Sequence, residues 1–164
     1  MNPQRTIHVA VQSDDGKSMI LTGRLQDPFH DIVVTAAIDR PSLSITWATG
    51  EMPRVPYGTK CQPSLGGLSA LAGVELAAGL SRKLRAFLSG EMGCPHLVDL
   101  AEQICRFAQV MIKSGEARQL VTDGNYAGYL ELRGQMGACA GHTLAHENEL
   151  PQWLENEMRK HPDE

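Results

Sequence analysis

The first fifty residues alternate between apolar and polar side chains, and this pattern limits the possible folds more than any other feature of the chain. Ile7, Val9 and Val11 share one parity, and after a turn at Asp14-Asp15-Gly16-Lys17 the alternation resumes at residues 19, 21 and 25. A period of two residues is typical of a strand with one buried face. The chain therefore begins with at least two strands.

Two further strands are expected before residue 50. Residues 30–39 form an apolar run, and Arg40-Pro41-Ser42 turns the chain into a fourth segment around Leu43, Ile45 and Trp47. Because the links are short, consecutive strands are expected to pair as an antiparallel meander. Residues 50–60 contain Pro53, Pro56 and Gly58, and we expect them to be irregular.

The remainder favours helices. Helical periodicity indicates segments at 64–71, at 75–88 with a stop at Gly90, and from Pro95 to Gly115. Residues 116–141 are ambiguous, and Tyr126 to Leu132 could form a strand or a loop. The tail at 150–161 predicts an amphipathic helix with Trp153, Leu154 and Met158 inward.

These elements predict an α+β fold, with an antiparallel sheet of three or four strands and helices packed on one face. A length of 164 residues favours one domain over residues 1–149, followed by a helical tail at 150–164.

Composition excludes several classes of function. The net charge of −4 gives no basic face for nucleic acid, and no apolar run reaches the roughly 20 residues of a membrane span. The N-terminal residues lack the pattern of a signal peptide, so a cytoplasmic location is expected. In that compartment the four cysteines are expected to be reduced thiols.

The sequence Gly93-Cys94-Pro95-His96-Leu97 places a thiol and an imidazole at the start of a helix. Proline suits the first helical position, because its missing N–H would have no partner there. The free amides and the positive end of the helix dipole stabilise a thiolate. Cys94 is therefore a candidate nucleophile or metal ligand, with His96 as its partner.

Other residues with metal-binding side chains stand at the boundaries of predicted elements. His30 and Asp31 open the third strand, and Cys61 closes the loop before the first helix. If these boundaries meet at one edge of the domain, Asp31, Cys61 and Cys94 are the proposed ligands, completed by His96 or His30. Thiolate ligands favour zinc or an iron–sulfur cluster.

Structural roles compete with each of these assignments. Cysteines commonly fill space in a core, which is the favoured interpretation of Cys105. His30 shares the parity of Ile32 and Val34, so it can be a buried histidine with satisfied hydrogen bonds. Cys139, His142 and His146 form a second cluster, in which Gly141 argues against a firm helix.

The assembled motifs resemble an uncharacterised bacterial family, domain of unknown function 2889. The resemblance covers about residues 20–113 and comprises His30-Asp31, Ile38-Asp39, Pro56 to Cys61, Leu71-Ala72-Gly73 and Gly93 to Leu97. Pro95 replaces the threonine that is usual in the family. The resemblance implies no activity.

The chain more distantly resembles iron–sulfur scaffold proteins of the IscU/NifU type, which have an antiparallel sheet followed by helices. That resemblance implies that Asp31, Cys61 and Cys94 match three of the cluster ligands, whereas Phe29 stands at the position of the first cysteine.

Three functions follow from the sequence. The preferred one is a small cytoplasmic protein that binds zinc or an iron–sulfur cluster. The first alternative is a thiol-dependent enzyme or sulfur carrier with Cys94 as nucleophile and His96 as base. The second is an accessory subunit that binds a larger enzyme through its helical face or its C-terminal tail.

Overall fold

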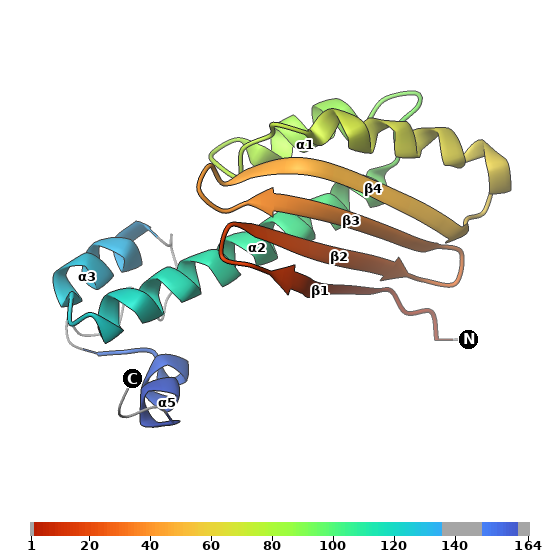
Figure 1. Cartoon of the computed structure of the whole chain (residues 1–164). Helices are drawn as coiled ribbons and strands as arrows, with labels where there is room; N and C mark the ends of the chain where they lie inside the picture. The colour runs from red at the N-terminus through yellow and green to blue at the C-terminus, as the bar shows by residue number, and fades with distance from the viewer. Residues whose placement is uncertain (1, 136–148, 161–164) are drawn as a thin grey trace. The chain divides into compact units, whose positions relative to one another are not determined.

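Four antiparallel strands form one sheet in the computed structural model, which describes residues 2–135 and 149–160 (Figure 1). The strands are β1 (Thr6–Asp14), β2 (Ser18–Gln26), β3 (Asp31–Asp39) and β4 (Ser44–Arg54), and they lie side by side in sequence order. The predicted antiparallel meander is therefore confirmed.

Strand β4 is longer than the sequence predicts. It continues to Arg54 through Pro53, in a region where we expect irregular structure. Because β4 is an edge strand, a proline can sit in it without removing a hydrogen bond from the interior of the sheet.

Helices cover one face of this sheet. Gly23, Val34 and Gly50 are paired across β2, β3 and β4, so they share a face. A Cβ atom at Gly23 would lie 2.9 Å from Ile104, and one at Gly50 would lie 2.9 Å from Leu68. Ile104 and Leu68 belong to different helical segments, and both pack on this face of the sheet. The predicted packing of helices on one face is therefore confirmed.

The helical elements of this part of the chain are two 3₁₀ helices, η1 (Gly58–Lys60) and η2 (Gln62–Leu71), and the α-helices α1 (Leu80–Leu88) and α2 (Pro95–Thr122). Helix α1 begins five residues later than predicted, because Gly79 adopts a left-handed conformation with φ of 81°. Helix α2 continues through Gly115, since one helical glycine costs only about 1 kcal/mol relative to alanine.

Contacts divide the chain into two compact units, residues 1–109 and 110–164. The second unit contains the end of α2, α3 (Tyr126–Gln135) and α5 (Gln152–Lys160). A small core forms from Ala117, Val121, Tyr129, Leu132 and Leu154.

Two predictions for the second unit need correction. The segment from Tyr126 is helical rather than a strand or loop, and it buries Tyr129 and Leu132. The tail helix is confirmed as α5, but only Leu154 of its three apolar residues is buried, and Trp153 remains 40% exposed.

No helix in the described part of the chain combines the length and apolarity needed to cross a bilayer.

Candidate functional site

The turn between β2 and β3 is organised by the carboxylate of Asp27. Its Oδ1 atom accepts hydrogen bonds from the backbone amides of Phe29 (2.9 Å) and His30 (2.7 Å). The Asp27 amide in turn donates to the carbonyl oxygen of His30 at 2.9 Å. Aspartate followed by proline, here Pro28, is a favoured start for such a turn. The local sequence therefore fixes His30 beside Asp27.

Arg54, at the end of β4, secures this turn. Its guanidinium donates to the carbonyl oxygens of Asp27 (2.9 Å) and His30 (3.3 Å). The extension of β4 beyond its predicted end thus has a consequence for the candidate site, because it brings this arginine to the turn.

The start of α2 supplies the second histidine. Pro95 is the first helical residue, as predicted, and the carbonyl of Cys94 accepts the amides of Leu97 (3.0 Å) and Val98 (3.3 Å). A Cβ atom at Gly93 would lie only 2.4 Å from the backbone of Ser89, so the close approach of the chain there requires glycine. This packing places His96 in the first turn of the helix.

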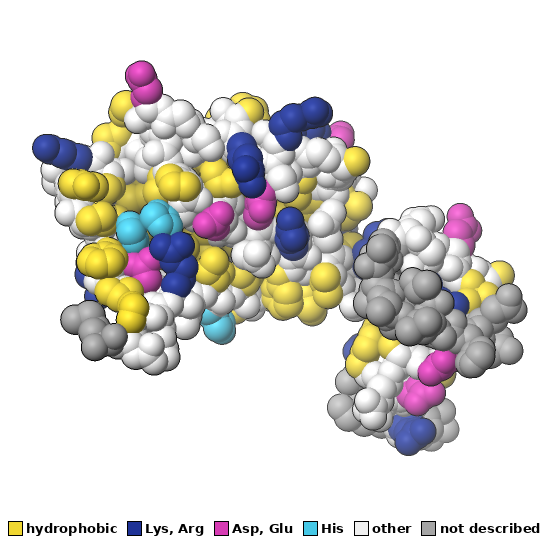
Figure 2. All heavy atoms as spheres, turned by 180° about the vertical axis from the view of Figure 1, so that it is seen from behind, with side chains coloured by type: hydrophobic (Ala, Val, Ile, Leu, Met, Phe, Trp, Pro, Cys, Tyr) yellow, Lys and Arg dark blue, Asp and Glu magenta, His cyan; other side chains and the backbone are white. Residues whose placement is uncertain are grey.

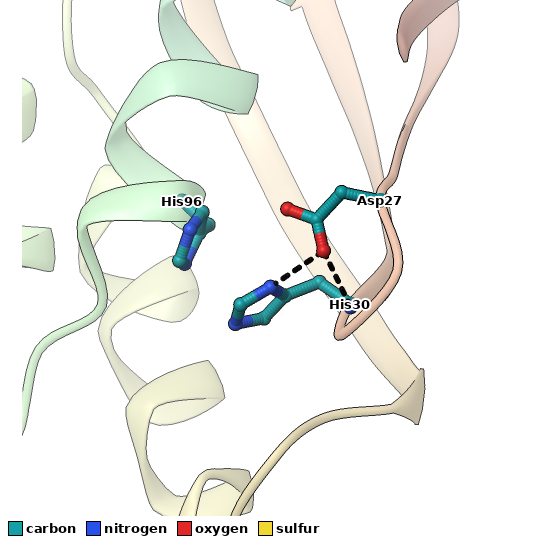
Figure 3. A group of neighbouring side chains, drawn as sticks. All are labelled: Asp27, His30 and His96. Carbon is teal, nitrogen blue, oxygen red and sulfur yellow. Dashed lines mark hydrogen bonds and ion pairs between the residues drawn. The ribbon is translucent and has the colours of Figure 1, made fainter. Parts of the chain in front are cut away.

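Asp27, His30 and His96 meet in one group, which we call the Asp/His/His cluster (Figure 3). One potential ligand atom from each residue lies within 4.8 Å of the other two. The centroids of the two imidazole rings lie 4.0 Å apart, and the ring planes are tilted by 38°. Figure 2 shows histidine side chains beside acidic and basic groups, with apolar side chains around them.

Asp27 determines which nitrogen of His30 carries a proton in the metal-free chain. Nδ1 of His30 lies 2.9 Å from Oδ1 of Asp27, and an ionised carboxylate only accepts hydrogen bonds. Nδ1 therefore carries a proton in the metal-free chain. Because the two ring nitrogens point in diverging directions, an ion that Asp27 also binds would meet His30 at Nδ1, after the loss of that proton.

Arg5 joins the cluster from the segment before β1. Its Nε and Nη2 atoms donate to Oδ2 of Asp27 at 3.0 and 2.7 Å, and Nη2 also donates to Nε2 of His96 at 3.1 Å. Because a guanidinium has no acceptor, Nε2 of His96 must present its lone pair to Arg5.

The ionisation of the cluster follows from these contacts. Burial opposes the charge on Asp27, but hydrogen bonds from the Phe29 amide, Arg5 and His30 hold the pKa of this carboxyl well below its usual value. Burial, then the neighbouring His30 and Arg5, lower the pKa of His96. The cluster thus combines a carboxylate with a neutral imidazole, which are the forms that bind metals.

A cleft of about 330 Å³ adjoins the two histidines. Its walls include Cys61, Cys94, Lys60, Tyr57 and Met92. Clefts of this size accommodate small molecules. Sγ of Cys94 lies 3.7 Å from Nδ1 of His96, which carries the proton when Nε2 accepts from Arg5.

Four of the five residues proposed as ligands from the sequence line this one cleft: His30, Cys61, Cys94 and His96. The fifth, Asp31, is not brought to it. Asp31 shares the helix-free face of the sheet with Gln26, and its two oxygens accept hydrogen bonds from Arg24 at 2.8 and 2.6 Å. Hydrogen bonds from Arg24 lower the pKa of Asp31.

The cysteines differ in their surroundings. Cys61 and Cys94 are half-buried free thiols at the cleft, but neither belongs to the Asp/His/His cluster. Cys105 is buried in the core, as expected for a packing residue, and burial raises its pKa to about 12. Cys139, His142 and His146 lie outside the described residues.

Sequence reasoning missed Asp27 and Arg5. The signal for Asp27 was the dipeptide Asp27-Pro28 between two strands, which marks the first residue of a turn. Arg5 precedes the first strand with no local pattern that connects it to residues 27 and 96.

Comparison with known proteins identifies a family but no activity. The family model described as "Protein of unknown function (DUF2889)" matches residues 5–110, which include all the residues of the cluster. No curated protein and no solved structure matches the chain. The resemblance to IscU/NifU-type scaffolds is therefore not supported.

Proposed function

We propose that this chain, which belongs to the DUF2889 family, binds one divalent transition-metal ion at Asp27, His30 and His96. The description of the family names no activity, so the proposal rests on the residues of the chain itself. The observation that carries the proposal is the convergence of a carboxylate and two imidazoles within 4.8 Å. These three ligands are typical of zinc and iron(II) sites.

The electrostatics of the cluster support this proposal. A neutral His96, whose pKa is lowered by burial, and an ionised Asp27 need no deprotonation before they bind a cation at neutral pH. The hydrogen bond between Asp27 and Nδ1 of His30 already holds these two side chains together in the folded chain, so an ion that replaces the Nδ1 proton finds both in place.

An iron–sulfur cluster is not part of this proposal. Such clusters are held mainly by cysteine thiolates, and neither Cys61 nor Cys94 has its sulfur within the Asp/His/His cluster. Three protein ligands leave a coordination position for water or a small molecule. The adjoining cleft, which both histidines line, gives such a molecule access.

Calorimetric titration of metal-free protein with zinc tests the proposal. We expect one equivalent of zinc to bind to the wild type. In the double variant His30→Ala/His96→Ala, we expect the zinc affinity to fall by more than the roughly 10- to 100-fold that removal of an outer partner costs. His8→Ala, an exposed histidine on β1, is the matched control and should bind as the wild type does. Equal binding by the wild type and the double variant would refute the proposal.

A second candidate function is thiol chemistry at Cys94. It is favoured by the 3.7 Å separation of Sγ and the Nδ1 atom of His96 at the cleft. Because Arg5 holds the lone pair at Nε2, Nδ1 donates to the sulfur, so His96 would stabilise a thiolate rather than accept the thiol proton. We therefore do not propose His96 as the base that removes the thiol proton of Cys94.

Alkylation kinetics test this second function. His96→Ala should slow the reaction of Cys94 with iodoacetamide about tenfold at neutral pH, since the thiolate loses a hydrogen bond from the imidazole. Cys61 in the same protein is the internal control, and its rate should not change. An unchanged rate at Cys94 would remove the case for a thiol function.

A further inference from the structure

Arg5 forms hydrogen bonds with the atoms that would bind the proposed metal. Two of its nitrogens bind Oδ2 of Asp27, and one of them also binds Nε2 of His96. Because Asp27 uses its other oxygen for the turn and for His30, Oδ2 is the atom it can offer to an ion. The guanidinium therefore sits where these acceptor atoms converge.

We propose that Arg5 is an internal cation that competes with the metal for Asp27 and His96 and so sets the affinity of the site. This inference rests on the proposed metal site. A divalent ion and a guanidinium cannot share these two atoms, because Nε2 of His96 has a single lone pair, Oδ2 of Asp27 already accepts two hydrogen bonds from Arg5, and the two cations repel each other. Binding of the metal therefore requires Arg5 to leave.

The position of Arg5 makes this exchange feasible. Its side chain is 47% exposed, whereas that of Asp27 is 6% exposed, so the arginine can reach solvent without movement of the carboxylate. Residues 2–5 precede β1 and are exposed. When the metal binds, the segment before β1 loses its side-chain attachment to the β2–β3 turn.

The apparent dissociation constant depends on how often the ligand atoms are free. If Arg5 leaves them free in about one molecule in ten, the metal binds about tenfold more weakly than to an open site. Removal of the guanidinium should therefore tighten binding, which is the opposite of what loss of a structural contact or of a ligand would do.

Zinc titrations of three full-length variants test the proposal. Arg5→Gln should bind zinc about tenfold more tightly than the wild type. The zinc affinity of Arg5→Lys should lie between these two, because lysine keeps the positive charge but lacks the planar pair of N–H donors of a guanidinium. Arg24→Gln, which removes the equivalent partner of Asp31, is the matched control and should change affinity less than about twofold.

A second measurement covers the case in which Arg5→Gln disturbs the fold. Zinc should accelerate tryptic cleavage of wild-type protein after Arg5, because the released segment becomes a better substrate. General stabilisation by a ligand would slow this cleavage, so the direction of the change separates the two effects.

The outcomes are distinct. Tighter binding by Arg5→Gln with faster cleavage after Arg5 supports the competition. Zinc binding that is equal or weaker in Arg5→Gln, or cleavage that zinc leaves unchanged or slows, overturns it and leaves the metal site standing. Failure of every variant and of the wild type to bind zinc overturns the metal site and the competition together.

Discussion

Two aspartates at the ends of the β2–β3 turn, Asp27 and Asp31, each pair with an arginine, but the two pairs have different neighbours. Arg24 meets Asp31 with one nitrogen on each carboxylate oxygen, at 2.8 and 2.6 Å. Arg5 instead places both nitrogens on the single oxygen Oδ2 of Asp27. The second oxygen of Asp27 is thereby left for the turn amides and for His30.

The comparison shows that an ion pair does not by itself indicate a binding site. Asp31 is as buried as Asp27, at 8% and 9% exposure, and both have a lowered pKa. Only Asp27 has two imidazoles beside it. The two histidines beside Asp27 make the first pair a candidate metal site, whereas the second pair is a structural contact.

The largest expected effect is a difference in metal affinity between two equivalent substitutions. Asp27→Asn should weaken zinc binding by more than the roughly 10- to 100-fold that removal of an outer partner costs, because it removes the charge of a ligand. Asp31→Asn removes the same charge at similar burial and should change the affinity less than about twofold. Calorimetric titration measures both. Equal losses in the two variants would mean that only the general electrostatic field matters.

The arrangement of His30 and Asp31 explains why the sequence led to the wrong neighbour of the histidine. Consecutive residues of a strand point to opposite faces. His30 precedes β3 with the parity of Ile32, on the face that the helices cover, whereas Asp31 pairs with Gln26 on the helix-free face. Strict use of this alternation separates the two residues from the sequence alone.

The strands and the beginning of α2 were predictable because local sequence determines them. Alternation defines β1 to β3, and Pro95 marks the first residue of α2. The contact of Arg5 with residues 27 and 96 was not predictable, since it spans 91 positions in the chain and depends on tertiary packing. The reach of β4 to Arg54 was missed because Pro53 was interpreted as a strand breaker rather than as an edge-strand residue.

The pH dependence of stability should also distinguish the two pairs. Unfolded His96 takes up a proton near pH 6.5, whereas the folded chain takes it up only at lower pH because its pKa is lowered. The unfolded state therefore binds more protons in this window, and stability falls as the pH decreases from about 6.5. Denaturant unfolding of wild type and His96→Gln at pH 5 to 8 measures this, and the variant should lose that part of the slope.

Asp31 should contribute only at more acidic pH. Its lowered pKa means that the stabilisation is complete above the unfolded value of about 3.9 and is lost as the pH falls below it. Asp31→Asn should therefore leave the slope between pH 5 and 8 as it is in the wild type. A changed slope in that window would show that the Arg24–Asp31 pair is coupled to the histidines.

The smallest expected effect concerns the thiol nearest to the cluster. Sγ of Cys94 lies 3.7 Å from Nδ1 of His96. The other ring nitrogen, Nε2, accepts the hydrogen bond from Arg5, which also binds Asp27. A metal bound through Nε2 would leave the sulfur as a neighbour of the ligand rather than a ligand. Cys94→Ser should then change zinc affinity by less than about twofold, as should Cys61→Ser, the control at the same cleft.

Cobalt in place of zinc gives an independent measurement, because cobalt bound by thiolate has an intense charge-transfer absorption that oxygen and nitrogen ligands do not produce. Its absence in the wild type, together with unchanged affinity in Cys94→Ser, would assign the ion to the Asp/His/His cluster. A loss of more than about tenfold in Cys94→Ser alone would instead mean that the ion binds through Nδ1 of His96 and the sulfur. In that case Arg5 could keep its hold on Nε2, and the difference between the two arginine–aspartate pairs would no longer concern the metal.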